Sequence, residues 1–579
     1  MYVKTTTRKV KGGEVRYLHL AHNEWDAAAR RSVPKLLYSF GREDQLDKDA
    51  VRRLVASLAR LLDPADALAA TTDGELVFSE SRPYGGAYVL DALWNRLGTG
   101  SILSGLRASG RGRPRDAPAT ERVLFGLVAN RALAPSPKLA AAEWMSRDVH
   151  IDGVADVSDD ACYRAMDWLH AVRAELEKQV YVQVADLLDL EVDLLFFDTT
   201  STYFELEDAD EEAARNWRGE RASGDDADPD KTAGFRTHGK SKDSRDDLPQ
   251  IVIGMAVTRQ AIPVRVWCWP GNTADSALIR QVRDDMRDWT LGKIIWVADR
   301  GFSSAGNRRY LQRGAGGYII GEKLRSESPH VKAALSRQGR YQQVAGNLQV
   351  KEVRISDTDR FVICHNPGAA VRDAAIRDKL VAHLEQTIAG SDQLSATKRA
   401  ELRGKISMMP GLNRFLRLTP GGLLRADKAK IKAEANLDGK YLLRCSDPQL
   451  SAEDIATGYK QLLEVERGWR DMKQVLDLRP VYHRLEERIR AHVLLCWLAL
   501  LLIRIAENTT GQTWPVMRRE LDRIHLGTFT GPAGTFRQRT ELTKPARDLL
   551  AKLAIDPPHQ IHQLAPGHLT GTTIPAARS

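Results

Sequence analysis

Residues 194–204 read LLFFDTTSTYF, an apolar run that ends at Asp198 and continues in hydroxyl-bearing side chains. A strand that is buried on both faces has a near-continuous run of hydrophobic residues. This run ends in an acidic residue followed by hydroxyl-bearing residues, which is typical of a strand that leads into a functional site. Residues 293–302, KIIWVADRGF, form a second run of the same kind and place Asp299 at its end. We therefore expect Asp198 and Asp299 each to lie at the edge of one sheet.

The residues around these two runs predict a mixed α/β fold. Residues 250–259 and 262–271 are apolar segments separated by so few residues that they indicate a β-hairpin. An amphipathic helix is expected at residues 276–289, and one more helix and strand at residues 308–323. In this order the first three strands are antiparallel and the later ones parallel, an arrangement that can bring the two acidic strand ends together.

A pair of neighbouring carboxylates indicates a metal site. Two such groups repel each other unless a cation lies between them. Oxygen ligands with no His or Cys nearby favour Mg²⁺ or Mn²⁺. For either aspartate alone, the alternative is a strand-end cap or a turn residue.

Residues 452–476 are expected to form one long amphipathic helix that carries a third acid. Tyr459, Glu466 and Lys473 recur every seven residues, so they share one stripe, and Arg470 lies on the same side. These side chains belong either to a site or to a solvated charged face. Trp469 either stacks on a displaced base or packs in the core.

Bulk composition describes a globular protein with a polyanionic partner. The chain has 579 residues, which predicts two to four domains, and a net charge of +9, which favours nucleic acid. Its five cysteines form no C-x-x-C pair, as is usual in a reducing cytosol. The longest apolar run, residues 493–503, is too short to span a bilayer and predicts a buried core helix. We expect a cytoplasmic protein with no membrane partner.

The chain divides by composition into six regions. They are a small β module (1–48), a helical and possibly DNA-binding domain (49–190), the first part of the α/β core (191–330), a β-rich insertion (331–450), the second part of the core (451–510) and a C-terminal region that could serve dimerisation (511–579).

Residues Gly234–Ser241, GFRTHGKS, match the phosphate-loop pattern G-x-x-x-x-G-K-[ST]. A working phosphate loop joins a buried strand to a helix, whose first N–H groups bind the phosphates. The flanking segments, DDADPDKTA and KDSRDDLPQ, are too polar for either element. A P-loop NTPase remains an alternative function, but Lys240, Lys242 and Arg245 are better placed to touch a DNA backbone.

Together these segments resemble the DDE transposases of bacterial insertion sequences, specifically the IS-four-like superfamily with its Y-(2)-R-(3)-E-(6)-K signature. The resemblance covers roughly residues 190–510, with FFDTTSTYF at the first acid, WVADRGF at the second and Y-(2)-L-(3)-E-(6)-K at the last. Leu462 stands where the family has arginine. A phosphate contact made there would fall to Lys460, Arg467 or Arg470.

The resemblance implies a ribonuclease-H-like catalytic core with a β-rich insertion between the second acid and the final glutamate. It implies that Asp198, Asp299 and Glu466 are catalytic and hold two Mg²⁺ or Mn²⁺ ions. With them the enzyme would cut DNA at a transposon end and direct the freed 3′-OH at target DNA.

Further roles follow from the same resemblance. Tyr459, Arg470, Lys473 and Arg300 would contact DNA. The partners would be double-stranded DNA, both the terminal inverted repeats and the target, and a second copy of the chain in a synaptic complex. The protein would be bacterial and associated with the nucleoid. A non-catalytic DNA-binding protein derived from a transposase is the remaining alternative.

Overall fold

The computed structural model describes most of the chain: residues 1–10, 13–27, 30–59, 77–109, 117–154, 156–187, 194–289, 293–326, 328–356, 360–531 and 534–566. The end of the expected C-terminal region, residues 567–579, lies outside the described residues. The chain forms two compact units. The first holds residues 1–80, 527–538 and 561–579, and the second holds residues 81–526 and 539–560.

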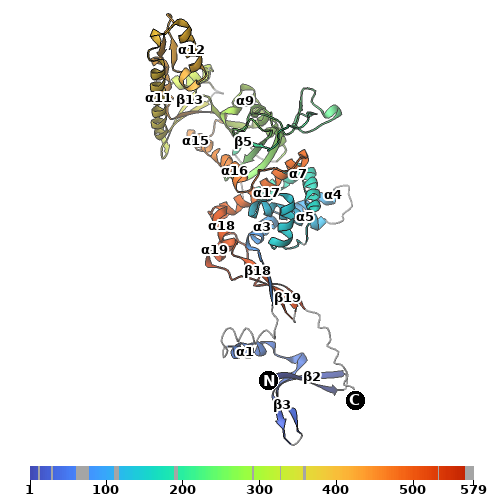
Figure 1. Cartoon of the computed structure of the whole chain (residues 1–579). Coiled ribbons are helices and arrows are strands. Elements are labelled where there is room, and N and C mark those ends of the chain that lie inside the picture. The colour runs from blue at the N-terminus through green and yellow to red at the C-terminus, as the bar shows by residue number, and fades with distance from the viewer. Residues whose placement is uncertain are drawn as a thin grey trace. The chain divides into compact units, whose positions relative to one another are not determined.

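The first unit is built mainly of strands (Figure 1). An antiparallel sheet is formed by β1 (Tyr2–Val10), β2 (Gly13–Asp26) and β3 (Arg31–Arg42), and α1 (Lys48–Ala59) follows it. A four-stranded sheet has the order β20-β19-β18-β4; its strands are β4 (Val77–Pro83), β18 (His525–Gly531), β19 (Gly534–Arg539) and β20 (Ile561–Pro566).

The second unit contains a nine-stranded mixed sheet, as the α/β prediction required. Its order is β12-β13-β14-β17-β11-β10-β5-β8-β9. The five strands at one end are β5 (Leu194–Tyr203), β8 (Gln250–Val257), β9 (Pro263–Pro270), β10 (Ile295–Ala298) and β11 (Gly317–Glu322). β8 is antiparallel to both β5 and β9, whereas β10 is parallel to both β5 and β11. The predicted change from antiparallel to parallel strands is therefore confirmed.

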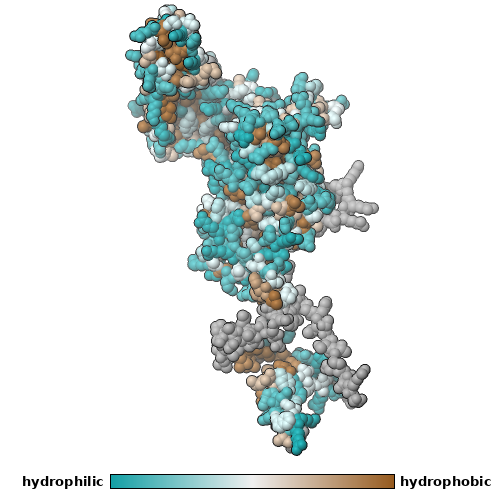
Figure 2. Space-filling view, in the orientation of Figure 1, coloured by the Kyte–Doolittle hydropathy of each residue, from teal (hydrophilic) through white to brown (hydrophobic). Residues whose placement is uncertain are grey.

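The region between β11 and the last acid continues the same sheet. Strands β12 (Gln342–Ala345), β13 (Leu348–Arg354), β14 (Arg360–His365) and β17 (Lys440–Cys445) extend it beyond β11. Between β14 and β17 lies a helical lobe with its own small core. The lobe holds α11 (Pro367–Ile388), α12 (Ala396–Ser407), α13 (Pro410–Asn413), β15 (Leu416–Leu418), β16 (Leu424–Ala426) and α14 (Lys428–Ala435). Brown apolar residues show on its surface in Figure 2.

A helical bundle precedes the sheet and shares one core with it. The helices are α3 (Gly85–Arg96), α4 (Thr99–Ser109), α5 (Ala117–Leu133), α6 (Lys138–Glu143) and α7 (Asp159–Leu187). They pack with α17 (Glu486–Thr510), α18 (Trp514–Leu521) and α19 (Lys544–Lys552). α17 also contacts β9, so the bundle and the sheet bury a single hydrophobic cluster.

Helix α17 contains the longest apolar run of the sequence. By length and composition it could cross a membrane, but 94% of its most apolar window is buried inside the protein. Its residues from Val493 to Ile503 are all buried. The prediction of a buried core helix is confirmed.

The prediction of one long helix over residues 452–476 is wrong. The structure has two helices, α15 (Ala452–Lys460) and α16 (Leu463–Gln474), separated by a turn at Gln461 and Leu462. The two pack on different parts of the sheet, α15 against β10, β11 and β13 and α16 against β5 and β8. Hydrogen bonds from Leu462 N to Tyr459 O and from Val465 N to Leu462 O tighten the chain at this turn.

Candidate active site at the strand ends

Asp198 and Asp299 occupy neighbouring positions on two parallel strands. The pairing of β5 with β10 sets Phe197 beside Ala298, so the next residue of each strand is the acid. Adjacent strands lie about 4.8 Å apart. The expectation that the two acidic strand ends come together therefore holds in this geometry.

Both acids lie on the same face of the sheet. Side chains alternate along a strand, and Phe196 and Val297, two residues before the acids, belong to the larger core on one face. Phe197 and Ala298 belong to the core on the other face. Asp198 and Asp299 consequently share the face that α15 and α16 cover.

Helix α15 reaches Asp299 through its tyrosine. The Tyr459 hydroxyl donates to Asp299 Oδ1 over 3.0 Å. Gly321 of β11 leaves the space for this ring, because a Cβ atom there would lie 2.5 Å from the Tyr459 hydroxyl oxygen. Burial and the nearby Asp299 raise the pKa of Tyr459, so it stays a neutral donor.

Helix α16 lies close against the strand residue opposite Asp198. Met255 of β8 pairs directly with Asp198, and a Cβ at Gly468 would lie 2.7 Å from the Met255 Cε atom. Glu466 precedes that contact by two residues and is exposed. Among the described residues it forms no ion pair, whereas its neighbours Glu464 and Asp471 pair with Arg467 and Arg504. Glu466 is therefore an exposed carboxylate without a described ion pair, on the helix that packs against β5 and β8.

A lysine that follows the GFRTHGKS segment lies between Asp198 and Asp275. Lys242 Nζ lies 3.7 Å from Asp198 Oδ1 and 3.4 Å from Asp275 Oδ2, at the start of α8 (Asp275–Asp285). It also donates to Thr199 Oγ1 over 2.6 Å, and its backbone N–H donates to Ser201 Oγ. Its ammonium thus neutralises part of the carboxylate charge.

The carboxyl group of Asp198 is strongly perturbed. Its side chain is 22% exposed. Burial raises its pKa to about 6, the nearby Asp299 and Asp275 add to the rise, and Lys242 opposes it. A carboxyl in this state gains most from a further cation. The donor set of oxygens alone, with acids on adjacent strands, fits Mg²⁺ or Mn²⁺.

The phosphate-loop pattern does not form a phosphate loop. Residues after Ser241 make turns and then enter β8, so the helix that such a loop requires does not follow. Gly239 packs against backbone, since a Cβ there would lie 2.1 Å from Gly271 O. The structure therefore gives no support to the P-loop NTPase alternative.

Of the predicted DNA-contacting residues, Tyr459 and Lys242 contact the strand-end acids, and the other five fall into two groups. Lys473 is half-buried and pairs with Asp243, 3.0 Å away, and Arg245 pairs with Asp247. Burial lowers the pKa of Lys473, although Asp243 opposes this. The other group is exposed and forms no ion pair among the described residues; its members are Lys240, Arg300 and Arg470.

A cavity of about 510 Å³ opens beside Asp299. Arg300 and Tyr459 line it, together with three basic residues that the sequence reasoning missed, Lys323, Arg325 and Lys440. Lys323 and Arg325 lie in the loop after β11, and Lys440 is the first residue of β17. Asp275 was also missed. The sequence showed only that these four residues lie at or near the end of a strand or helix. That position does not reveal which residues lie next to them in the folded chain.

Burial bears on the roles expected for two further residues, Leu462 and Trp469. Leu462, which stands where the family has arginine, is buried and cannot replace that contact. Trp469 is 5% exposed and packs in the main core, which favours the core role over base stacking.

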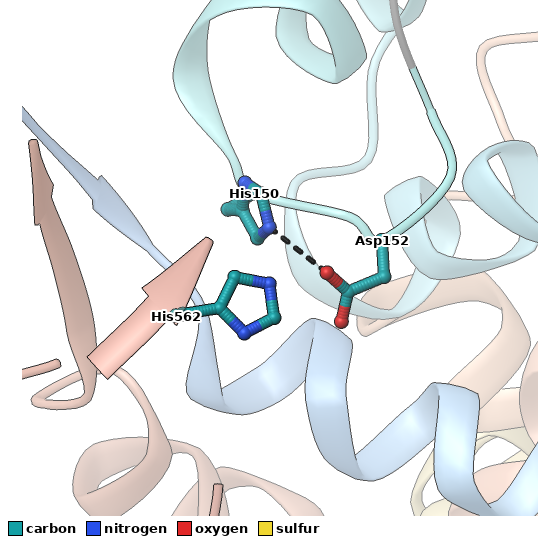
Figure 3. A group of neighbouring side chains, drawn as sticks. All are labelled: His150, Asp152 and His562. Atoms are coloured by element: carbon teal, nitrogen blue, oxygen red, sulfur yellow. Dashed lines mark hydrogen bonds and ion pairs between the residues drawn. The ribbon is translucent and has the colours of Figure 1, made fainter. Parts of the chain in front are cut away.

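A histidine–carboxylate pair lies outside this site. His150 Nε2 and Asp152 Oδ1 are 3.1 Å apart (Figure 3). His562, also drawn there, belongs to the first compact unit. We do not count these residues among the candidate ligands of the strand-end acids.

Residues 216–502 match the protein family described as "Transposase DDE domain". The chain carries a transposase DDE domain. Asp299 and Glu466 lie inside the matched residues, whereas Asp198 precedes them by 18 positions, 216 minus 198. The pairing of β5 with β10 places the strand of Asp198 beside a strand of the matched region.

Among solved structures, the chain is similar to a cryo-EM structure of the piggyBac transposase synaptic complex with hairpin DNA. The sequence identity is 13%, the likeness covers 75% of this chain and 80% of that chain, and the TM-score is 0.33. No curated protein sequence matches the chain. The family match therefore carries the identification of the DDE domain.

Proposed function

We propose that this protein is a DNA transposase that cuts and joins DNA strands with Asp198, Asp299 and Glu466. The observation that carries the proposal is the convergence of two strand-end acids on the sheet face that α15 and α16 cover. The strand order β9-β8-β5-β10-β11, with three antiparallel strands followed by two parallel ones, supports a ribonuclease-H-like core. The match to the DDE domain family supports the chemistry.

The carboxylates of the three acids would hold two Mg²⁺ or Mn²⁺ ions. When bound, such ions lower the pKa of an attacking water and stabilise charge on the leaving oxygen. The chain's own residues prepare this site. Tyr459 fixes the orientation of Asp299, and Lys242 limits the repulsion between Asp198 and its neighbours until cations arrive.

DNA would be bound by the basic residues around the acids. Arg300 and Lys323 line the cavity beside Asp299, and Lys240 and Arg470 are exposed and free of described ion pairs. Phosphate contacts of this kind position a strand without reading its sequence. Terminal inverted repeats would be the specific sites, two copies of the chain would form the synaptic complex, and the protein would act at the bacterial nucleoid.

The direct test is strand cleavage by the full-length protein. A DNA fragment with the inverted repeats that flank the gene is incubated with the protein and Mg²⁺, and denaturing gels report nicks with free 3′-OH ends. We expect cleavage at the repeat ends that EDTA abolishes. Specific binding without cleavage in either Mg²⁺ or Mn²⁺ would instead identify a non-catalytic DNA-binding protein.

Replacing Lys242 by methionine should tighten Mn²⁺ binding roughly tenfold, because a competing ammonium is removed from the Asp198 carboxylate. Calorimetric titration of the DNA-free protein with Mn²⁺ measures the change. Lys240→Met is the matched control, since Lys240 is exposed and two residues away. Unchanged or weaker Mn²⁺ binding by the Lys242 variant would mean that this lysine supports the metal site instead.

Replacing Tyr459 by phenylalanine should lower the cleavage rate about tenfold, because a hydrogen bond to a charged group contributes about 1.5–3 kcal/mol. Initial rates at saturating Mg²⁺ measure the effect. The control is Tyr441→Phe, whose ring stacks on Tyr459 at a centroid distance of 6.0 Å. Equal rates for both variants would remove Tyr459 from the positioning of Asp299.

A further inference from the structure

A second cavity, of about 270 Å³, lies in the helical bundle among residues that the DDE chemistry does not use. The end of α5, the start of α6, α7, α17 and the segment before α17 form its walls. Its polar lining includes Arg131, Lys138, Tyr163, Tyr482, His483 and His492.

Two basic side chains of this cavity, Arg131 and Lys138, are buried with no counter-ion among the described residues. Arg131 and Lys138 are 3% and 4% exposed. The described contact of Lys138 Nζ is His492 Nδ1, 3.4 Å away. Arg131 donates to neutral oxygens, including the backbone carbonyls of Leu476 and Asp477 at 3.4 and 3.3 Å. Within the described part of the chain, no carboxylate forms an ion pair with either side chain.

The acids described near the cavity do not pair with these two side chains either. Asp477 is the one acid among the lining residues; it is exposed and reaches Arg131 through its backbone oxygen. Asp167, a carboxylate that acts on the pKa of His483, pairs with Arg488 over 2.8 Å. The cavity therefore gathers basic side chains that no carboxylate of the described residues pairs with.

Burial of unpaired charge is costly, and the cavity shows that cost. Burial, aided by the nearby Arg131, lowers the pKa of Lys138 to about 7. Burial and Lys138 lower the pKa of His483 to about 3. An anion in contact with the lysine would favour its charged form and give its remaining N–H donors an acceptor.

We propose that this cavity binds one phosphate group, held by Lys138 with Arg131 and His483. A phosphate oxyanion accepts several charge-assisted hydrogen bonds, which suits a lysine and an arginine side by side. The exposed Leu139 and Tyr482 at the lining leave room for an organic substituent. The phosphate is either free in solution or the terminal phosphate of a DNA strand.

The location gives the bound phosphate a structural consequence. Arg131 and His492 bond the carbonyls of residues 476–478, the segment that directly follows α16. A phosphate that draws on the same side chains acts on the chain just beyond the helix that carries Glu466. This site is separate from the strand-end acids and does not depend on the proposed cleavage activity.

The test is calorimetric titration of the full-length protein in EDTA, so that no metal can hold phosphate at the acids. Inorganic phosphate is one titrant, and a six-nucleotide single strand with or without a 5′-phosphate is the other. We expect saturable binding that Lys138→Met weakens roughly tenfold or more. Binding of inorganic phosphate points to the free ion, and binding that requires the 5′-phosphate points to a DNA end.

Controls separate this site from general basicity. Lys379→Met, at an exposed position of α11, should bind like the wild-type chain. His483→Phe should weaken binding several-fold and provides the answer if Lys138→Met fails to fold by circular dichroism. Absence of saturable binding by the wild-type chain, or equal affinity in the Lys138, His483 and Lys379 variants, overturns the proposal.

Discussion

Replacing Glu466 by glutamine should reduce metal-dependent DNA cleavage by about a thousandfold or more. Loss of one carboxylate from a metal site removes several kcal/mol of transition-state stabilisation, and each 1.36 kcal/mol is a factor of about ten. Binding to terminal-repeat DNA should remain. Glu466 is exposed and forms no ion pair among the described residues, so its replacement should leave the fold intact.

The matched control is Glu464→Gln on the same helix. Glu464 pairs with Arg467 over 3.8 Å, and both side chains are more than a third exposed. Such a surface pair contributes little to stability. Single-turnover cleavage rates with Mg²⁺ and DNA-binding isotherms should separate the two variants. Full cleavage by the Glu466 variant would exclude Glu466 from the catalytic site.

Replacing Arg504 by methionine should lower the free energy of unfolding by about 3–5 kcal/mol, because it breaks a buried ion-pair network. The Arg504 side chain is 1% exposed and bonds Glu507 of its own helix and Asp471 of α16, the latter over 2.5 Å. Arg467 also joins Glu507 from α16. These bonds hold the glutamate-bearing helix against α17, so cleavage should fall together with stability.

Chemical denaturation followed by circular dichroism measures this effect. Arg147→Met is the control, because the Arg147–Glu143 pair is 74% and 62% exposed. A pair of that kind is worth at most about 0.5 kcal/mol. If the two variants lose the same small amount of stability, the network does not anchor α16.

Much of the α/β core was predictable because a buried strand or helix requires apolar residues at neighbouring positions of the sequence. A strand covered on both faces must be apolar throughout, so LLFF and IIWVA each predicted a strand. The acid that follows each run then marked the end of that strand. The same reasoning found α17. The break at Gln461 and Leu462 was not predictable, because the 3.6-residue pattern continues through it.

The sequence alone therefore determined the two acidic strand ends, the change from antiparallel to parallel strands and the buried helix α17. Tertiary structure alone decided that Lys242 pairs with Asp198 and that α15 and α16 separate. It also decided that Arg131 and Lys138 line one cavity with no carboxylate partner among the described residues. The physical reason is the distance along the sequence over which each property is set. Burial and strand ends are properties of a few consecutive residues, whereas the environment of a charge depends on groups far away in the chain. Lys138 and His492 are 354 residues apart.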